Sequence, residues 1–523
     1  MNFCGSARYR RVFYLSKKKK GLGLNYKRTA LIGFGFMGCM VLWSVYNSYV
    51  PVILRGKLFE AGADTFFNSH PLFSWISVAL IVNAIMTIDN IFGVIFQPYF
   101  GKRSDATHSK MGKRMPFIIT CLPICALFFC FIPVAATVRS VGLSILLMMT
   151  VIIFFNFTMS IWRSPVVSLM PDFTPSSLQS DANAVINIMG GIGQMLGFVI
   201  GTIAAALVGL FGFVQLSAGL KAKTNDLGQI IDKETGALLL DGAGNPQYVN
   251  YTPVFVVTAL ISVICLVILV IFYKRNKKYD LSAEVDYTAA QGEEKKKIKI
   301  KNLPISKEEK RSLITMLAAL FLINNATEAI VPNFTNFANS TLHVAPIYST
   351  LMMAVFAVSL ALFGIPAGMM GRKLGRKKTI MIGLIAIVAM FGVYLAVSQI
   401  IPAKADGSVN TFTWVILWIA IVVGGAAVGC VNINTLPLVL AIGSREYVGT
   451  FTGYYYTATF SAAVTGPILC GLVIGLFNED YNYMFLFCAV MFALGLIVVS
   501  RVRHGETQIT EEELAQIRME NED

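Results

Sequence analysis

Apolar residues run along this chain in about twelve stretches of roughly 20–28 residues, each bounded by a short polar segment. A helix of about 20 residues rises about 30 Å, which matches the hydrocarbon core of a bilayer. Soluble helices of this length keep one polar face, and most of these stretches have none. The pattern predicts twelve membrane-spanning helices, near residues 30–54, 76–100, 116–137, 141–168, 182–212, 252–273, 312–337, 345–370, 379–402, 413–441, 449–476 and 483–503.

Composition supports the same fold class. Of 523 residues, 55% are apolar and 14% charged, against roughly 25% charged in an average soluble domain. We therefore expect an all-α membrane protein with its helices in two pseudo-symmetric six-helix bundles. The expected segments are a basic tail (1–29), the first bundle (30–273), a charged linker (274–311), the second bundle (312–503) and a second tail (504–523).

The cations predict the orientation. With the N-terminus in the cytoplasm, the predicted inner segments, with Arg163 at the inner end of the fourth span counted among them, hold 36 of the 43 Lys and Arg residues. Basic residues mark cytoplasmic loops, so both termini are expected in the cytoplasm and the protein in the cell membrane. Because the net charge of +14 gathers at one set of helix ends, it does not indicate a nucleic-acid partner. The N-terminal tail lacks the apolar stretch of a signal peptide.

Two further expectations concern the loops and the cysteines. In the outer segment 213–251, two short apolar runs flank turn residues, which predicts a small β-hairpin. Eight of the nine cysteines fall in predicted helices and the ninth, Cys4, in the tail, so we expect no disulfide framework. No Cys/His spacing indicates a metal site, and no nucleotide-binding loop is present, so we expect no cofactor and no use of ATP.

The two halves repeat a feature. Basic clusters follow the second predicted helix of each half, as Gly112-Lys113-Arg114 and Gly375-Arg376-Lys377. Two such clusters at equivalent positions indicate an internal duplication, which is the build of major facilitator transporters.

The run QPYFGKRSDATHSKMGKRMPF (97–117) closely resembles the loop between helices two and three of sucrose/proton symporters and their bacterial relatives. These proteins belong with the glycoside–pentoside–hexuronide cation symporters of the major facilitator superfamily. The resemblance implies that this loop is a conformational gate, in which Asp105 accepts hydrogen bonds from helix N-termini or from Arg114. The alternative is a solvated loop that only fixes topology. The expected gate residues are Gly101, Asp105, Gly112, Arg114 and Arg376.

Two carboxylates lie well inside the predicted spans, Asp89 in the second and Glu328 in the seventh. A charge at mid-bilayer costs about 2.5–3.5 kcal/mol on the more lenient scale, so such a residue usually faces a watery cavity and has a function. A carboxyl group in such a site can bind and release protons near neutral pH. We therefore predict that both couple proton movement to transport. The structural alternatives are a local hydrogen bond between Asp89 and Asn90, and a position of Glu328 near the outer interface.

The resemblance bears on two more points. Sodium-using relatives of the melibiose type carry two acidic residues where this chain has Gly93 and Gln97, which favours protons over sodium. Sucrose symporters carry an arginine on helix four, and Arg163 falls on it. The aspartate expected five residues later is absent, with Asp172 nine residues on. Arg163 is therefore either a functional residue or an interfacial anchor.

A sugar site needs aromatic rings and amides that donate and accept hydrogen bonds. The predicted substrate residues are Trp43, Asn183, Asn187 and Asn325. The predicted spans contain no cluster of cations that would suit an anionic substrate. The expected function is proton-coupled symport of a neutral sugar, a di- or oligosaccharide glycoside, by a monomer in the lipid bilayer. A multidrug or metabolite/proton antiporter of the same fold is the alternative. A membrane-embedded enzyme is disfavoured, because no HExxH motif or paired intramembrane aspartates occur.

Overall fold

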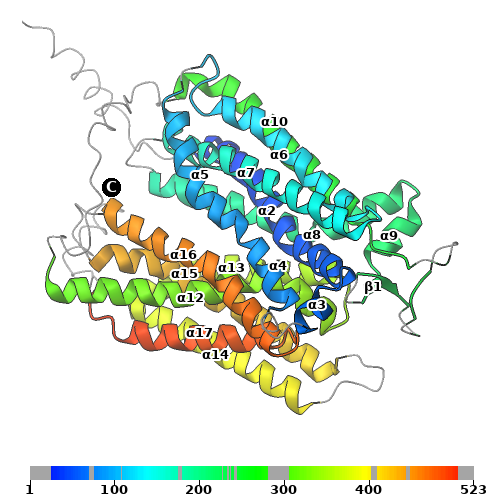
Figure 1. The fold of residues 1–523 in the computed structure, drawn as a ribbon. Coiled ribbons are helices and arrows are strands. Elements are labelled where there is room, and N and C mark those ends of the chain that lie inside the picture. Colours follow the sequence, from blue (N-terminus) through cyan, green and yellow to red (C-terminus); the bar gives the residue numbers. More distant parts are fainter. Residues whose placement is uncertain are drawn as a thin grey trace, which may run out of the picture.

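The computed structural model describes residues 25–69, 76–107, 109–174, 179–225, 228–232, 235, 237–240, 244, 246–280, 305–401, 409–442 and 448–504. Within these ranges, twelve spans are long and apolar enough to cross a membrane (Figure 1). They are α2 (Tyr26–Glu60), the pair α4 (Val78–Met86) and α5 (Ile88–Asp105), α6 (Met115–Ala136), α7 (Val141–Phe173), α8 (Gln179–Leu210), α10 (Thr252–Asn276), α12 (Lys307–Ser340), α13 (Pro346–Leu374), α14 (Arg376–Ile400), α15 (Thr411–Ile442), α16 (Val448–Leu476) and α17 (Tyr483–Ser500).

The predicted all-α fold with twelve spans is confirmed, with two local differences. The second span is divided, because the helix breaks at Thr87 between α4 and α5. The seventh span begins five residues before its predicted start. There, the Ser306 side chain accepts from the Glu309 backbone N–H while the Glu309 side chain accepts from the Ser306 N–H. This reciprocal capping box satisfies two donors at the helix start, so α12 begins at Lys307.

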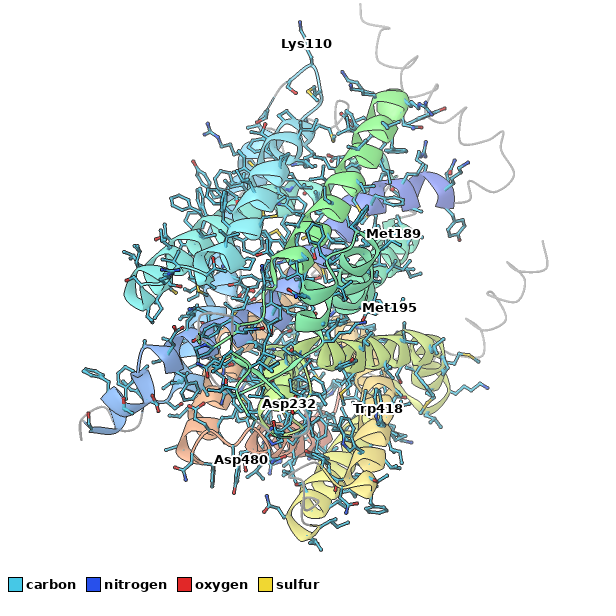
Figure 2. The ribbon with its side chains drawn as sticks, turned by 90° about the vertical axis from the view of Figure 1, so that its right-hand side faces the viewer. Lys110, Met189, Met195, Asp232, Trp418 and Asp480 are labelled. Atoms are coloured by element: carbon cyan, nitrogen blue, oxygen red, sulfur yellow. The ribbon has the colours of Figure 1, made fainter. Side chains whose placement is uncertain are left out.

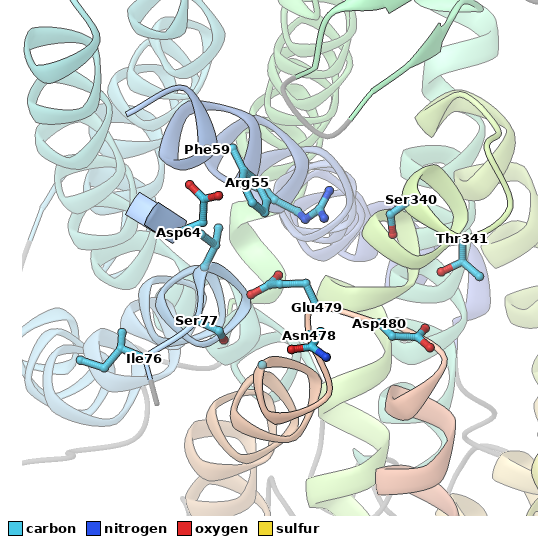
Figure 3. Close-up of a pocket in the computed structure, with 12 residues that line it drawn as sticks. Arg55, Phe59, Asp64, Ile76, Ser77, Ser340, Thr341, Asn478, Glu479 and Asp480 are labelled. Carbon is cyan, nitrogen blue, oxygen red and sulfur yellow. The ribbon is translucent and has the colours of Figure 1, made fainter. Parts of the chain in front are cut away.

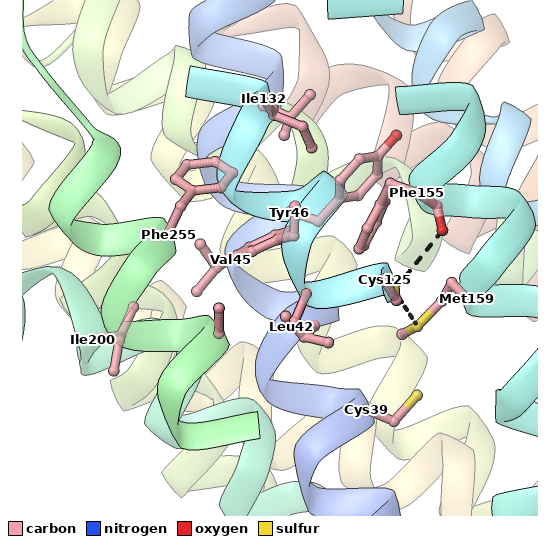
Figure 4. Packing of buried hydrophobic residues seen from close by; sticks show 14 of the residues in the cluster. Cys39, Leu42, Val45, Tyr46, Cys125, Ile132, Phe155, Met159, Ile200 and Phe255 are labelled. Atoms are coloured by element: carbon pink, nitrogen blue, oxygen red, sulfur yellow. Dashed lines mark hydrogen bonds between the residues drawn. The ribbon is translucent and has the colours of Figure 1, made fainter. Parts of the chain in front are cut away.

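Each half packs around its own apolar core. One cluster draws mainly on α2 to α10 and the other mainly on α12 to α17. In the first core, Tyr46 stacks on Phe155 with ring centroids 5.1 Å apart, and the Cys125 thiol lies 3.9 Å from the Phe155 carbonyl oxygen (Figure 4). The eight cysteines in the described ranges are free thiols.

The two ends of the bundle differ. We call the end where the described chain begins (Asn25) and stops (His504) the terminal end, and the opposite one the distal end. Lys110, in the loop between α5 and α6, lies at the terminal end, and Asp480, between α16 and α17, lies at the distal end (Figure 2).

The described parts of the long segment 213–251 lie at the distal end. It contains α9 (Val214–Leu220) and two short antiparallel strands, β1 (Lys223–Thr224) and β2 (Ile230–Ile231). The Leu239 N–H donates to the Ile230 carbonyl at 2.9 Å, and Ile231 bridges to Leu238. The predicted β-hairpin is therefore confirmed. The remaining short elements are α3 (Ala63–Ser69) and the 3-10 turn η2 (Lys277–Tyr279).

Candidate functional site

The predicted carboxylates Asp89 and Glu328 come together with Arg163 at the seam between the halves. Asp89 is 4% exposed and interacts electrostatically with both Arg163 and Glu328. Glu328 also interacts with Arg163. Because α5 and α7 belong to the first half and α12 to the second, this electrostatic interaction extends across the seam.

Local structure explains the position of Asp89. The break at Thr87 places Asp89 in the first turn of α5, where the positive end of the helix dipole favours a carboxylate. Its Oδ1 also accepts from the Asn90 N–H at 2.5 Å. The local hydrogen bond foreseen as an alternative is therefore present together with the charge interactions.

Glu328 lies in the interior of α12, and its side chain is exposed while its neighbours Ala326 and Ala329 are buried. Since Glu328 interacts with Arg163 and Asp89 of the other half, its exposed side faces the space between the halves. This position differs from the alternative of a residue near the outer interface.

Arg163 is a central residue rather than an interfacial anchor. Its guanidinium carbon lies 4.4 Å from the centre of the Trp43 ring, a cation–π contact between α7 and α2. Nearby, the Asn156 side chain donates to the Tyr46 hydroxyl at 3.1 Å and holds the same two helices together. Sequence spacing left Arg163 undecided, since its partners Asp89 and Glu328 are distant in the chain.

The four predicted substrate residues lie in different environments. Trp43 is half-buried beside Arg163, and Asn187 is exposed on α8. Asn183 is on α8, and its side chain is outside the described part of the chain. Asn325 is 1% exposed, donates to the Phe321 carbonyl at 2.7 Å and accepts from the Thr465 hydroxyl at 2.8 Å. In this conformation Asn325 joins α12 to α16, and its role as a substrate ligand stays a prediction.

The predicted gate loop is held to its own half at the terminal end. Arg114 is buried, donates to the Ser104 hydroxyl at 2.6 Å and forms an ion pair with Asp172 at 2.9 Å. Asp172 was not foreseen as a partner, because it lies 58 residues away in sequence. Asp105 is the last residue of α5, and its side chain is outside the described part.

The two predicted gate glycines differ in what they allow. A Cβ on Gly101 would lie 2.8 Å from the Ser164 hydroxyl oxygen, so the glycine allows α5 to approach α7 closely. Gly112 has a φ of +83°, a backbone conformation that residues other than glycine rarely adopt. Its N–H donates to the Ser109 carbonyl at 3.0 Å and closes a turn. In the second half, Arg376 donates to the Pro437 carbonyl at 3.0 Å. These contacts stay within one half.

Hydrogen bonds join the two halves toward the distal end. The side-chain amides of Asn83 (α4) and Asn333 (α12) donate to each other, both at 2.8 Å. The Asn90 side chain donates to the Ala463 carbonyl at 3.3 Å. The Tyr49 hydroxyl lies 3.5 Å from the Thr350 hydroxyl.

A polar pocket of about 540 Å³ opens on the distal seam, lined by residues of both halves (Figure 3). Glu479, in the loop between α16 and α17, accepts from the backbone N–H of Ala79 at 2.9 Å. Ala79 is in the first turn of α4, so the second half places a carboxylate at a helix N-terminus of the first. Arg55 lies with its guanidinium 5.2 Å from the Tyr481 ring centre. The halves are thus closed together at this end.

The sequence comparison shows the family. The profile of the Major Facilitator Superfamily matches residues 32–336 and 314–518. The chain belongs to the major facilitator superfamily. A search of curated proteins finds no match.

Solved major facilitator structures share the fold at low identity. A mutant of the nucleoside transporter NupG is 14% identical, with a TM-score of 0.54 over 91% of this chain and 99% of that one. A bacterial homologue of the iron transporter ferroportin is 12% identical, with a TM-score of 0.55 over 92% and 99%. A peptide transporter in complex with sulfate is 10% identical, with a TM-score of 0.56 over 93% and 96%.

Membership in the major facilitator superfamily makes this chain a multi-pass membrane transporter, not an enzyme. In a transporter of this superfamily, a charged group at the interface of the halves lies where the substrate and coupling-ion sites are expected. The cluster of Trp43, Asp89, Arg163 and Glu328 is therefore the candidate site.

Proposed function

We propose that this protein is a proton-coupled symporter of a neutral sugar, a di- or oligosaccharide glycoside, working by alternating access. The observation that carries the proposal is the grouping of Asp89, Arg163 and Glu328 at the seam. Two ionised carboxylates and one guanidinium carry one net negative charge, and a single bound proton neutralises the group. Since an unbalanced charge inside the membrane is unfavourable, the movement between conformations is favoured when the proton is bound.

The sugar would bind beside this group. Trp43 offers an aromatic face for a pyranose ring, and Arg163 now lies against that ring. Sugar stacking on Trp43 would compete with the guanidinium and turn Arg163 toward the carboxylates, which links substrate to proton binding. Asn187 and Asn183, on α8, are the proposed amide ligands. A neutral solute suits this site, because Asp89 and Glu328 already balance the charge of Arg163. An anionic substrate would need a positive charge that the protein does not balance itself.

The proposed membership in the sucrose/proton symporter group rests on the loop at residues 97–117. The proposed setting is the cell membrane, with the transporter a monomer whose termini are cytoplasmic. The distal end would then face outward. The hydrogen bonds between the halves at Asn83 and Glu479 would close the outer side. On the inner side, the loop at Arg114 would be bound to its own half and would leave the two halves free to separate.

The test is uptake of a radiolabelled sugar panel into proteoliposomes, with and without an inward proton gradient. We expect at least one disaccharide to accumulate only with the gradient. Accumulation driven by sodium and indifferent to pH would contradict the proton assignment. Gradient-driven export of amphipathic drugs, with no sugar movement, would favour the multidrug or metabolite/proton antiporter instead.

A further inference from the structure

Three asparagines follow one another along the distal part of α12, at Asn333, Asn336 and Asn339. They lie beyond Glu328 and are 1%, 1% and 4% exposed. Residues three apart lie next to one another on one side of a helix, so the three amides form a continuous strip. We call this strip the amide ladder.

The two outer members of the amide ladder bind the first half of the protein. Asn333 exchanges two hydrogen bonds of 2.8 Å with Asn83 of α4. Asn339 accepts from the hydroxyl of Thr224 in β1 at 2.7 Å. Asn336 lies between them on the helix, so its side chain also faces the seam between the halves.

Asn336 differs from its neighbours. Within the described part of the chain, neither its amide nitrogen nor its amide oxygen has a hydrogen-bond partner, although the residue is 1% exposed. Burying an amide without partners is unfavourable, so native proteins seldom keep one without a reason. A group that lacks partners in one conformation can find them in the other.

The amide ladder also connects two sites. Toward the middle of the membrane, α12 leads from Asn333 to Glu328 of the charge cluster. In the distal direction, the next residues after Asn339 are Ser340 and Thr341, which line the 540 Å³ pocket at the seam. A solute passing from that pocket to Glu328 would follow this side of α12.

We propose that the amide ladder is a second binding station for a hydroxyl-rich neutral solute, open when the distal end is open. This inference rests on the proposed function, since it names further ligands for the same substrate. Each amide donates and accepts, as a sugar hydroxyl does. When the distal end closes, Asn333 replaces its hydrogen bonds to the solute with hydrogen bonds to Asn83, and Asn339 replaces its own with one from Thr224. Asn336 has no such replacement, so its unpaired amide favours reopening.

Thiol labelling tests the amide ladder, with Asn336→Cys as the reporter and Ala338→Cys as its matched control. Ala338 is on the same helix and 0% exposed, but it belongs to the core of the second half. An impermeant methanethiosulfonate reagent is added to the distal face of membrane vesicles, and the labelling of the native cysteines is measured in the parent. We expect Asn336→Cys to react as the transporter opens, sucrose to slow that reaction, and Ala338→Cys to stay unreactive.

The outcomes separate the two proposals. Equal rates for the two variants overturn the amide ladder. The amide ladder is also overturned if the parent transports sucrose but sucrose does not change the labelling rate of Asn336→Cys. If the parent transports none of the sugars tested, the proposed function fails. A faster reaction at Asn336→Cys than at Ala338→Cys then still supports a path along the ladder.

A second measurement keeps the proposal testable if labelling perturbs the fold. For Asn336→Ala, we expect a several-fold higher KM for sucrose entering from the distal side, with Asn336→Gln restoring part of the affinity. An unchanged KM in Asn336→Ala contradicts a binding role.

Discussion

The guanidinium carbon of Arg163 lies 4.4 Å from the centre of the Trp43 ring, while the same side chain interacts with Asp89 and Glu328. One residue therefore contacts the proposed sugar platform and also interacts electrostatically with the proposed proton carriers. A change at Arg163 should affect binding and coupling together.

For Arg163→Gln, we expect loss of proton-driven accumulation, because two carboxylates then lack their counter-charge. Arg163→Lys keeps the charge but loses the planar stacking on Trp43, so it should retain partial coupling. Uptake in proteoliposomes with an imposed pH gradient measures both. Full coupling in Arg163→Gln would remove Arg163 from the mechanism.

Asp89→Asn cannot bind and release a proton, yet it keeps the size and an accepting oxygen. Uphill accumulation should vanish, while exchange of labelled sugar between equal pools should survive, because exchange needs no net proton movement. Glu308→Gln, an exposed acid in the first turn of α12 at the terminal end, is the control and should behave as the parent. If Asp89→Asn still accumulates sugar, Glu328 becomes the leading proton carrier.

Glu479→Gln should weaken the distal closure, since it removes the charge that accepts from the Ala79 N–H. A carboxylate at a helix N-terminus contributes about 0.3–1 kcal/mol, so a modest shift toward the distal-open form is expected. Spin labels at Leu210→Cys and Ile400→Cys, 80% and 77% exposed at the distal ends of α8 and α14, report the separation of the halves. Glu60→Gln, whose salt bridge with Lys57 stays within α2, should leave that distance unchanged.

Asp172→Asn should destabilise the fold strongly, because it removes the buried carboxylate that balances the charge of Arg114. Breaking a buried pair in this way costs about 3–5 kcal/mol. The double variant Arg114→Met with Asp172→Leu removes both charges and should recover much of the loss. Thermal unfolding in detergent measures the difference. Equal stability of the single variant and the parent would mean that the pair contributes little.

The orientation is tested at two exposed loops. Gly244→Cys lies in the distal segment and Lys110→Cys in the terminal-end loop (Figure 2). On intact cells, an impermeant thiol reagent should label Gly244→Cys and should not label Lys110→Cys. The labelling of the parent, which comes from its native cysteines, is subtracted from each. The opposite pattern would reverse the orientation derived from the 36 cations at one set of helix ends.

The sequence by itself determined the helices and their number. Spans of apolar residues are local, and the bilayer imposes one length on all of them, so the twelve spans could be predicted to within about six residues, whereas the short helices α3 and α9 were not. The two basic clusters at Lys113 and Arg376 likewise revealed the repeat, because loop charge is readable without tertiary contacts. Asp89 and Glu328 could be found because any acid inside an apolar span is conspicuous.

Only the tertiary structure decided which of these residues meet. Arg163 could not be assigned from spacing, since its partners Trp43, Asp89 and Glu328 come from three other helices. On α12, Asn325 bonds to Thr465, whereas the side chain of Asn336 has no hydrogen-bond partner among the described residues. A helix side faces a neighbour only after packing, so the rotation of α12 against the first half separates a structural amide from a candidate ligand.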